Sequence, residues 1–372
     1  MTVDQGTRVA FVLGTSEGGV GRHVAMLAGG LVRGGHRVVV AGPPSTERAF
    51  GFAALGARFV PVPISDRPRP LDDLRAVMAL RTLRGAHAVH AHGLRAGALA
   101  AIALAGTGTG LVVTLHNAAT AGGVVGAVYG LLERIVARRA DRILVVSPDL
   151  GERMAHLGAR GVEAAVVPAP ALPPSGRAAG DIRRELGTGE RVIFLTVARL
   201  AQQKGLETLL DVAKALPEVR RDAEHASGPV FLVAGEGPLR AELQERIDRE
   251  NLPVRLLGAR TDVGDLLGVA RALLVPSRWE GQPLTVQEAL RAGTAVIATA
   301  VGGIPAMVGE AGLLVPYGDV AAMRDAVARV LADDGLAEEL AAAAAGRGRG
   351  MPGEPEALEA VLAVYAGLSP RG

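Results

Sequence analysis

Residues 272–299 read ALLVPSRWEGQPLTVQEALRAGTAVIAT, and this stretch decides the fold of the second half of the chain. The apolar runs at 272–275 and 295–298 are typical of buried strands. Between the two runs, Gly281 and Pro283 keep the chain out of a helix until an amphipathic segment begins. A strand, a loop, a helix and a second strand in this order predict a βαβ unit of a parallel sheet.

Two carboxylates flank the point where the loop of this unit becomes a helix. Glu280 lies in the loop, and Glu288 lies one turn into the predicted helix. A helix start offers unpaired backbone N–H groups and the positive end of a dipole, so it is suited to hold a phosphate. We therefore expect a phosphate at this junction, with the two Glu side chains holding sugar hydroxyls beside it.

The same alternation of short β-branched runs and helical stretches extends over most of the chain. The predicted strands are 8–13, 37–41, 58–63, 88–91, 111–115, 142–146 and 164–167, followed by 192–197, 230–234, 254–257, 272–275, 295–298 and 313–315. This pattern predicts an α/β protein with two doubly wound, Rossmann-like sheets. Open sheets of this kind bind ligands at the carboxyl ends of their strands, so we expect the two domains to face each other across a shared cleft.

Composition shifts give the expected domain boundaries. An N-terminal domain is predicted for 1–170, and a Pro- and Gly-rich linker for 171–188. A second domain is predicted for 189–345. The remaining residues, 346–372, are expected to include a helix at 354–368 that packs back on the first domain.

The overall composition excludes several function classes. Apolar residues make up 49% of the 372 residues and aromatic residues only 3%, which is typical of a globular α/β enzyme and not of a disordered chain. Without Cys there are no disulfides or thiolate metal sites, as is compatible with a reducing compartment. Forty basic against 38 acidic residues leave a net charge of +2, which gives little support to nucleic-acid binding.

Hydrophobic runs bear on membrane contact. The first residues, MTVDQGTRVAFVL, lack the features of a signal peptide, and no run reaches the ~18 apolar residues of a membrane span. The sequence therefore predicts a cytoplasmic protein. Residues 118–132 are small or apolar and precede the basic residues Arg134, Arg138 and Arg139. We interpret them as a buried helix, with a surface that contacts the inner face of the membrane as the alternative.

Residues 14–24, GTSEGGVGRHV, form a Gly-rich loop after the first predicted strand. Such a loop is found in dinucleotide-binding proteins, but the G-x-G-x-x-G spacing is missing here. No acidic residue closes the second strand, where Ala41 and Gly42 stand. A nicotinamide cofactor is therefore not expected. The glycines still allow the backbone to approach a diphosphate or sugar closely.

Three histidines lie near the ends of predicted strands, His90 and His92 at the end of one and His116 at the end of another. No carboxylate accompanies them at ligand spacing, so we do not expect a metal site. His116 follows its strand and is predicted to point into the cleft, where it accepts a hydrogen bond or stabilises charge on a sugar. His90 and His92 are interpreted as structural.

The second domain opens with two cations near one strand end, Arg199 and Lys204. Cations beside a helix start match the needs of a leaving diphosphate. The turns that contain Gly235 and Arg260 are interpreted as lining a base pocket, with plain turns as the alternative. Two carboxylates alone would also suit a glycosidase, but that enzyme class has no need of cations for a diphosphate.

Assembled, these residues resemble family 4 of the retaining glycosyltransferases, which have the GT-B fold. The matching segments are GGVGRHVAMLAGGLVRGGHRVVVAG (18–42), the residues Thr114, His116 and Asn117, VARLAQQKG (197–205), VAGEGPLR (233–240), EGQPLTVQEAL (280–290) and GGIPAMVGEAGLLVPYGD (302–319). The two glutamates in E-x7-E spacing, preceded by an Arg and a Lys, are the specific part. The Gly-rich loop alone is not specific.

The resemblance implies a role for each matching residue. Arg199 and Lys204 bind the donor diphosphate and stabilise it as it leaves, and Glu288 holds the nucleotide ribose. Glu280 binds the transferred sugar. The backbone of the next four residues also contacts that sugar, and these are Gly281, Gln282, Pro283 and Leu284.

For the first domain the resemblance places His116 beside the anomeric carbon, and Gly18 and Gly19 over the diphosphate. The family retains anomeric configuration without a protein nucleophile, because the leaving phosphate takes the acceptor's proton on the same face. An Asp-x-Asp dyad is missing, so no metal or other cofactor is expected. The co-substrate is a nucleotide-diphosphate sugar, and UDP is favoured over GDP.

Two departures from the family pattern concern specificity and the chain end. Gln282 and Pro283 stand where the family often has Phe and Gly, and GRGRGMPGEP at 346–355 replaces an aromatic segment before the last helix. The expected acceptor is a sugar, a small molecule or a lipid-linked molecule bound by the first domain. An NDP-sugar 2-epimerase of the same fold, and a non-catalytic partner that binds nucleotide-sugar, are the alternatives. The sequence predicts no oligomeric state.

Overall fold

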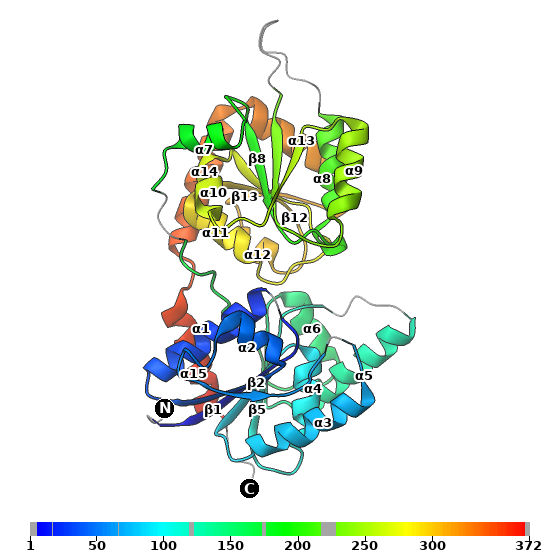
Figure 1. Cartoon of the computed structure of the whole chain (residues 1–372), viewed down its shortest axis with the longest axis vertical. Helices are drawn as coiled ribbons and strands as arrows, with labels where there is room; N and C mark the ends of the chain where they lie inside the picture. Colours follow the sequence, from blue (N-terminus) through cyan, green and yellow to red (C-terminus); the bar gives the residue numbers. More distant parts are fainter. Residues whose placement is uncertain are drawn as a thin grey trace, which may run out of the picture. The chain divides into compact units, whose positions relative to one another are not determined.

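The structure of the chain, a computed structural model, describes residues 6–16, 18–65, 67–118, 123–172, 176–216 and 228–368. It divides into two compact units, Met1–Pro168 together with Pro352–Gly372, and Ala169–Met351. Each unit is built on a parallel sheet with helices packed on its faces (Figure 1).

The first unit has a seven-stranded sheet in the order β3-β2-β1-β4-β5-β6-β7. Its strands are β1 (Arg8–Leu13), β2 (Arg37–Gly42), β3 (Arg58–Pro61), β4 (Ala88–His92), β5 (Gly110–Leu115), β6 (Arg142–Val145) and β7 (Val162–Ala164). Its helices are α1 (Gly19–Arg33), α2 (Pro44–Phe50), α3 (Pro70–Leu80), the short η1 (Arg81–Leu83), α4 (Leu94–Ala103), α5 (Gly123–Arg139), α6 (Pro148–His156) and α15 (Glu354–Ala366).

The second unit has a six-stranded sheet in the order β10-β9-β8-β11-β12-β13. Its strands are β8 (Ile193–Val197), β9 (Val230–Ala234), β10 (Val254–Gly258), β11 (Ala272–Val275), β12 (Ala295–Thr299) and β13 (Gly312–Val315). Its helices are α7 (Ala179–Glu185), η2 (Gln202–Lys204), α8 (Leu206–Ala215), α9 (Arg240–Glu250), α10 (Val263–Val269), α11 (Leu284–Ala292), α12 (Ile304–Val308), α13 (Val320–Ala332) and α14 (Asp334–Arg349).

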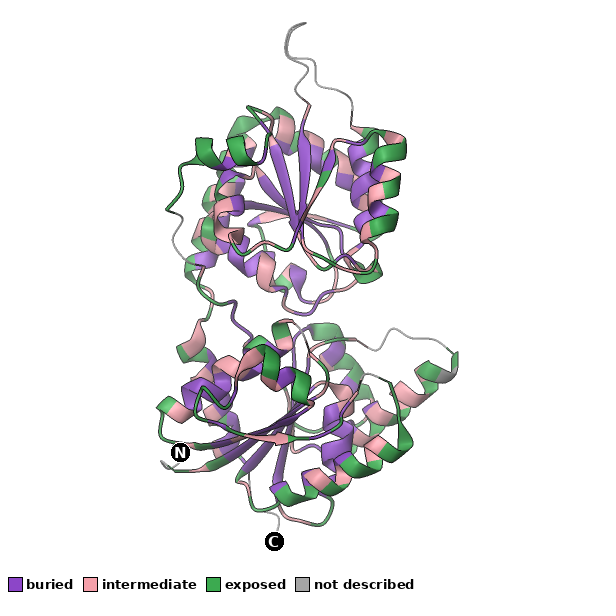
Figure 2. Cartoon of the chain, viewed as in Figure 1, coloured by how far each residue is buried: buried purple, intermediate pink, exposed green. Residues whose placement is uncertain are grey.

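The strands form the centre of each unit because they are apolar on both faces. All residues of β4, β5, β9, β11 and β12 are buried, as the purple strands of Figure 2 show. Parallel strands covered by helices on both sides require continuous Val, Ile, Leu and Ala runs instead of alternation with polar residues. This burial is why short apolar runs in the sequence predicted the strands.

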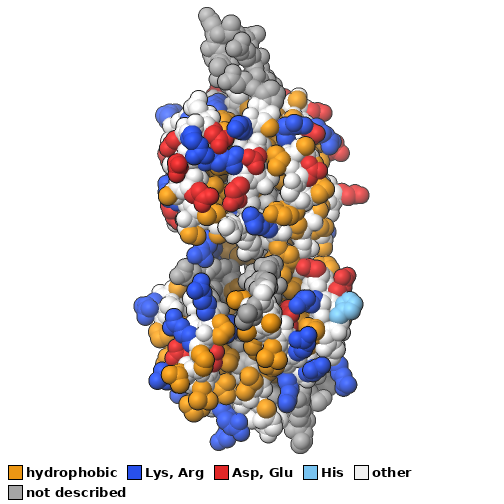
Figure 3. All heavy atoms as spheres, turned by 90° about the vertical axis from the view of Figure 1, so that its right-hand side faces the viewer, with side chains coloured by type: hydrophobic (Ala, Val, Ile, Leu, Met, Phe, Trp, Pro, Cys, Tyr) orange, Lys and Arg blue, Asp and Glu red, His pale blue; other side chains and the backbone are white. Residues whose placement is uncertain are grey.

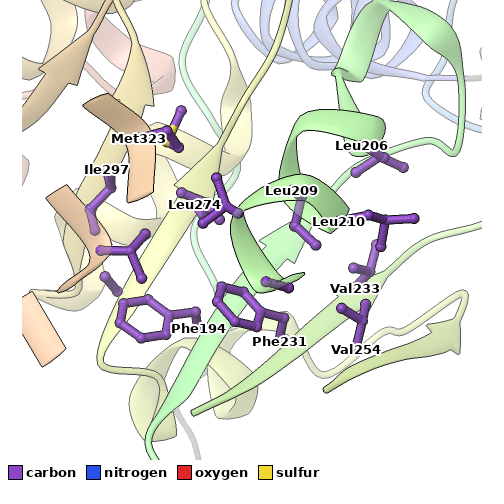
Figure 4. Close-up of a cluster of buried hydrophobic side chains, with 14 of the residues drawn as sticks. Phe194, Leu206, Leu209, Leu210, Phe231, Val233, Val254, Leu274, Ile297 and Met323 are labelled. Atoms are coloured by element: carbon purple, nitrogen blue, oxygen red, sulfur yellow. The ribbon is translucent and has the colours of Figure 1, made fainter. Parts of the chain in front are cut away.

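In the second unit, successive strand residues feed two separate cores. Phe194 and Phe231 stack on one face of the sheet with ring centroids 5.5 Å apart, in one cluster with Leu209 of α8 and Met323 of α13 (Figure 4). Their sequence neighbours, such as Leu195, point to the opposite face and pack with α7, α10, α11 and α12. Side chains alternate in direction along a strand, so one strand supplies both cores.

The last helix, α15, belongs to the first unit, where it packs against α1. Gly30 makes the close approach possible, since a Cβ on that residue would lie 2.5 Å from Leu358 Cδ1. Tyr365 is completely buried, and Arg33 forms an ion pair with Glu354 at the start of the helix. The chain thus leaves the first unit at 168 and returns to it at 352.

Some sequence-based boundaries differ from the structure. Residues 171–188 were expected to be a linker, but α7 lies within them and its Ile182 joins the core of the second unit. Residues 171–188 are rich in Pro and Gly, but they also contain a short amphipathic helix that packs against the second unit. The strand predicted at 164–167 lies earlier, at Val162–Ala164, and α14 continues to Arg349, past the boundary expected at 345. Residues 173–175 of the expected linker and 369–372 of the expected C-terminal segment lie outside the described residues.

Loops of the second unit approach each other so closely that glycine is required. Gly205 has a φ of +62°, and a Cβ there would lie 2.0 Å from the Pro276 carbonyl oxygen. A Cβ on Gly302 would lie 1.8 Å from the Glu280 carbonyl oxygen. The loops after β8, β11 and β12 are therefore in direct backbone contact.

We expect Gly205→Ala to destabilise the second unit more than Gly318→Ala does. Gly318 also has a positive φ, +82°, but a Cβ there meets no atom within 4 Å. Both substitutions carry the left-handed backbone penalty of roughly 1–2 kcal/mol, and only Gly205→Ala adds a clash with backbone. Chemical denaturation of the two variants measures the difference, and equal free energies of unfolding would contradict the tight loop packing.

Candidate functional site

The strand order of the second sheet creates a switch point between β8 and β11. These strands pair with each other, although β9 and β10 lie between them in sequence. The chain therefore runs outward from this point in opposite directions. The loops that leave the two carboxyl ends separate there, and ligands of open α/β sheets bind at this place.

A charged cluster lies at this switch point. Lys204 Nζ is 2.6 Å from Glu280 Oε1, and the Ser277 hydroxyl donates to the same oxygen at 2.6 Å. Glu280 is only 6% exposed, so its carboxylate is held by these two partners instead of by water. Within the described chain its other oxygen, Oε2, has no hydrogen-bond partner and is not enclosed. That oxygen can accept from a ligand hydroxyl.

Backbone contacts fix the two loops that carry this cluster. The Arg278 N–H donates to the Gln203 carbonyl at 2.8 Å, and the Gln203 side chain donates to the Trp279 carbonyl at 3.0 Å. The Glu280 carbonyl accepts from the Gly303 N–H at 3.0 Å. These hydrogen bonds join the two loops at the residues next to Lys204 and Glu280, so the fold sets the position of the pair.

Helix α11 (Leu284–Ala292) begins four residues after Glu280. Gly281 and Pro283 are buried and Gln282 is half-buried, and Leu284 is the first helical residue. Glu288 is buried one turn later. The helix is tied to the start of the unit, since the Ala169 N–H donates to Gln287 at 2.8 Å. The predicted sugar- and ribose-binding residues thus lie along one continuous segment, 280–288.

Two other predicted donor contacts lie on the same edge of the sheet. Arg199 follows β8 and is exposed, with no ion pair to any described residue. Gly235 follows β9 with a φ of +145°, and a Cβ there would lie 1.9 Å from the Ala198 carbonyl oxygen. Gly235 therefore lets the β9 loop contact the loop that carries Arg199.

Arg260 stands apart from the cluster. It follows β10, which is separated from β8 by β9, a distance of about 10 Å across the sheet. Its guanidinium donates to both oxygens of Asp262, at 2.8 and 2.6 Å, and to Glu185 at 2.8 Å. These hydrogen bonds raise the pKa of Arg260 and lower the pKa of Asp262. The side chain of Arg260 is thus engaged by two carboxylates, and its role in donor binding stays a prediction.

The first unit has a pocket of about 420 Å³ at the carboxyl edge of its own sheet. It lies where β1 and β4 pair, the switch point of that sheet. Its lining residues include Thr15, Ser16, Ser65, His92, Arg95, His116, Asn117 and Tyr129. The Arg95 guanidinium donates to the Ser65 carbonyl at 2.7 Å and to Asp73 at 2.6 Å, so its charge is already balanced.

Gly18 and Gly19 lie at the start of α1 beside this pocket. Gly18 is the N-cap residue and Gly19 is the first helical residue. The Ser16 hydroxyl, which lines the pocket, accepts from the Gly21 N–H at 3.0 Å. A Cβ on Gly18 would meet no atom within 4 Å, so the loop is open on that side. Contact of Gly18 and Gly19 with a diphosphate stays a prediction.

Four imidazoles pack together at the pocket, and we call them the histidine array: His23, His90, His92 and His116. His92 and His116 belong to the lining of the pocket. His92 stacks on His90 and on His116, with centroids 4.3 and 5.3 Å apart. His23 lies edge-on to His92 and His116. No group of three or more His, Asp or Glu side chains positioned to hold a metal ion is found among the described residues.

Burial keeps the array uncharged. It lowers the pKa of His23 to about 4 and the pKa of His116, also lowered by the nearby His23, to about 3. Burial, with the neighbouring imidazoles, holds the pKa of His90 and His92 well below 6.5. His116 therefore lines the pocket as a neutral ring.

Sequence reasoning missed two residues of these sites. Ser277 bonds Glu280, and its position three residues before the Glu was the available signal. His92 was interpreted as structural, but it lines the pocket and contacts His116. His90 is buried and bonds Tyr365 and Thr114. The spacing of two residues that put both His90 and His92 on one side of β4 was the signal for His92.

The histidine array makes stability depend on pH. We expect the free energy of unfolding to fall as pH drops from about 6.5 to about 4, by up to ~1.4 kcal/mol per pH unit for each array histidine. The unfolded chain takes up protons near 6.5, whereas the folded array does not until lower pH. Above about pH 6.5 the array does not make the free energy of unfolding depend on pH.

His23→Leu removes one of these groups and is expected to reduce the slope, measured by denaturation at several pH values. His156→Gln is the matched control, because His156 is exposed on α6. An unchanged slope in His23→Leu would show that His23 is not a neutral group in the folded state.

Comparison with known proteins shows which families and proteins this chain resembles. Residues 18–170 match the family model described as glycosyl transferase 4-like domain, and residues 191–333 match glycosyl transferases group 1. Glycogen synthase of Mycobacterium tuberculosis is 29% identical over 88% of this chain and 86% of that protein. Alpha-D-kanosaminyltransferase of Streptomyces kanamyceticus is 28% identical over 44% of this chain, and the match spans only 43% of its length.

A solved structure shows the same fold. HepE of Anabaena, crystallised with UDP, superposes with a TM-score of 0.81 over 97% of this chain and 100% of that chain, at 17% identity. The two parallel-sheet units described above are thus those of the GT-B fold. With both halves matched by glycosyltransferase models, the chain belongs to the family 4 type of glycosyltransferases with the GT-B fold.

Proposed function

We propose that the protein is a retaining glycosyltransferase that transfers a hexosyl unit from a nucleotide-diphosphate sugar, with UDP preferred over GDP and no metal required. The observation that carries this proposal is the Lys204–Glu280–Ser277 cluster at the switch point, just before helix α11. One cation, one carboxylate with a free oxygen and a helix start meet there. Together they suit a diphosphate bonded to a sugar.

Each group has a distinct task in this proposal. Glu280 Oε2 accepts from hydroxyls of the transferred sugar, while Oε1 holds Lys204. Lys204 and the exposed Arg199 neutralise the charge that develops on the diphosphate as the C1–O bond breaks. Glu288 bonds the ribose hydroxyls. The acceptor hydroxyl attacks C1 from the face that the phosphate leaves, and its proton passes to the leaving phosphate oxygen.

The comparisons support the donor class. HepE was crystallised with UDP and also with UDP-glucose, which fits a UDP-sugar. Gln282 and Pro283 stand immediately before α11, beside Glu280, and we propose that they select the sugar. The remaining alternatives give different products. A 2-epimerase isomerises the donor sugar without an acceptor, and a non-catalytic partner binds nucleotide-sugar without any turnover.

Lys204→Ala is expected to lower kcat at least ~100-fold with a smaller effect on KM, because the ammonium acts mainly on charge that develops in the transition state. Glu288→Ala is expected to weaken nucleotide binding instead. Donor hydrolysis in EDTA, followed by release of the nucleotide, measures both variants without knowledge of the acceptor.

Lys214→Ala is the matched control for this experiment. Lys214 is the chain's only other lysine, it is 62% exposed on α8, and it pairs with Glu250 away from the cluster. If no nucleotide-diphosphate sugar is bound or hydrolysed in EDTA, the proposed function is wrong. If Lys204→Ala hydrolyses the donor with the wild-type kcat, Lys204 has no part in the reaction.

The first unit carries an exposed apolar surface that bears on the acceptor. Leu71, Leu74 and Met78 of α3 are 73, 56 and 58% exposed and lie on one helix face. Leu131 of α5 is 56% exposed, and α3 and α5 both pack against α4. Hydrophobic side chains gather with basic ones on the first unit in Figure 3.

Exposed arginines surround this surface and suggest what covers it. Arg75 lies on the same face of α3, Arg81 and Arg84 follow that helix, and Arg134 and Arg138 follow Leu131 on α5. Apolar side chains flanked by Arg fit the interface of an anionic bilayer. We propose peripheral binding to anionic lipid, which would give the pocket access to a lipid-linked acceptor.

No described helix has the length and apolar content of a membrane span. Residues 119–122, part of the apolar stretch noted in the sequence, lie outside the described residues.

We expect the protein to cosediment with phosphatidylglycerol vesicles and not with phosphatidylcholine vesicles. Replacing Leu71, Leu74 and Met78 together by Ser is expected to weaken this binding at least ~10-fold, because each buried side chain contributes about 1.5–3 kcal/mol when fully covered. Tyr317→Ser, a change at an exposed apolar residue of the second unit, is the control. No binding of the wild type, or equal binding of the triple variant, would refute a lipid-facing surface.

A further inference from the structure

His116 is bonded within the histidine array through one ring nitrogen only. Its Nε2 lies 3.0 Å from His92 Nδ1, in line with a hydrogen bond between the two rings. In the described part of the chain its Nδ1 has no hydrogen-bond partner and is not enclosed by protein. Because His116 lines the pocket, Nδ1 is the atom that a ligand in the pocket meets.

The bond between the two rings contains one proton, and its position decides what Nδ1 can do. Both rings are neutral, so each has one N–H and one bare nitrogen. If His92 donates from Nδ1, then His116 Nε2 is the acceptor and His116 carries its own proton on Nδ1. If His116 donates from Nε2 instead, its Nδ1 is bare and His92 carries its proton on Nε2.

The surroundings of His92 decide between these arrangements. His92 Nε2 is buried and has no partner among the described residues. In the second arrangement this atom would be a buried N–H with no acceptor, and orphaned buried N–H groups are rare in proteins. In the first arrangement the same atom is only a bare acceptor, and both N–H groups of the pair point at a partner or at the pocket. The first arrangement is therefore favoured.

We infer that His92 is a positioning residue that fixes the tautomer of His116, so that His116 presents an Nδ1–H donor to the pocket of the first unit. The other contacts of the array support this role. His90 stacks under His92 and is itself held at both nitrogens, by Tyr365 Oη at 2.7 Å and by Thr114 Oγ1 at 2.6 Å. His92 thus rests on a ring that cannot turn without breaking two hydrogen bonds.

This tautomer limits the chemistry of His116. An Nδ1–H group donates to an oxygen of the sugar or acceptor and cannot take a proton from it, because Nε2, the bare nitrogen, is occupied by His92. The acceptor's proton must then go elsewhere, in the proposed reaction to the leaving phosphate. This consequence for the reaction rests on the proposed function, whereas the tautomer itself does not.

The tautomer can be read directly from nitrogen chemical shifts of the full chain labelled with ¹⁵N-histidine, since a protonated ring nitrogen differs strongly from a bare one. His116→Asn assigns the signal. We expect His116 to be protonated on Nδ1 and bare on Nε2 in the wild type near neutral pH. Protonation on Nε2, or on both nitrogens, would overturn the inference. Because this measurement uses the wild-type protein, it does not depend on whether a variant folds.

Two substitutions of His92 test its role in turnover. His92→Leu removes the donor, so we expect loss of the Nδ1–H preference and a roughly tenfold lower kcat/KM, about the effect of one hydrogen bond. Nucleotide affinity, measured separately, should stay unchanged. His92→Asn keeps a polar group near the position of Nδ1 and is expected to restore most of the activity. Wild-type kcat/KM in His92→Leu would contradict the positioning role.

A third variant separates positioning from general loosening of the array. Tyr365→Phe removes the hydrogen bond at the far end, on His90, and keeps the aromatic ring. We expect it to lower stability and to change the His116 tautomer and kcat/KM much less than His92→Leu does, because Thr114 still holds the His90 ring. Failure of the proposed function is distinguishable, because a protein inactive on every nucleotide-sugar can still show the Nδ1–H tautomer. An active enzyme with the opposite tautomer would overturn this inference alone.

Discussion

The direct backbone contact between the loops after β8 and β11 is the constraint on which the second unit's site depends. Gly205 and Pro276 meet with no room for a side chain, and the Lys204–Glu280 pair follows immediately from that contact. β8 and β11 are far apart in sequence and become neighbours because they pair in the sheet. Lys204, in the loop after β8, can therefore reach Glu280, in the loop after β11. The order of the strands in the sheet thus places the Glu280 carboxylate and the start of α11 at the switch point.

The first unit uses the same geometry for different chemistry. Its switch point lies between β1 and β4, but the side chains there are neutral imidazoles and hydroxyls instead of charged groups. Burial keeps those imidazoles uncharged, and Arg95 is balanced by Asp73. Among the described residues, the switch point of the second unit thus carries a cation and a carboxylate, whereas the pocket of the first unit is lined by neutral hydrogen-bonding groups and the paired Arg95. In the proposed reaction, the charged unit binds the donor and the neutral pocket meets the acceptor hydroxyl.

Local sequence patterns predicted most of the fold, but they failed where tertiary packing decides the structure. The strands were readable because parallel strands are apolar throughout, and β9 and β11 have the predicted bounds. Helix α7 was missed because Pro and Gly surround a segment that is too short to show a helical period. In the site, Lys204 and Glu280 were recognised, whereas the engagement of Arg260 by Asp262 and Glu185 was not. Asp262 lies only two residues from Arg260, but Glu185 lies 75 residues away, and an ion pair between elements so far apart leaves no trace in local sequence.

By itself the sequence determined the two-domain α/β architecture and singled out the charged residues that meet at the switch point of the second unit, because apolar runs and motif spacing are local properties of the chain. Only the tertiary structure decided how those residues are partnered. It placed the Ser277 hydroxyl on Glu280, set the buried His92 in the wall of the pocket, and joined Tyr365 of the last helix to His90 of β4. Hydrogen-bond partners and burial depend on which strands become neighbours in the sheet, and that order is a property of the folded chain.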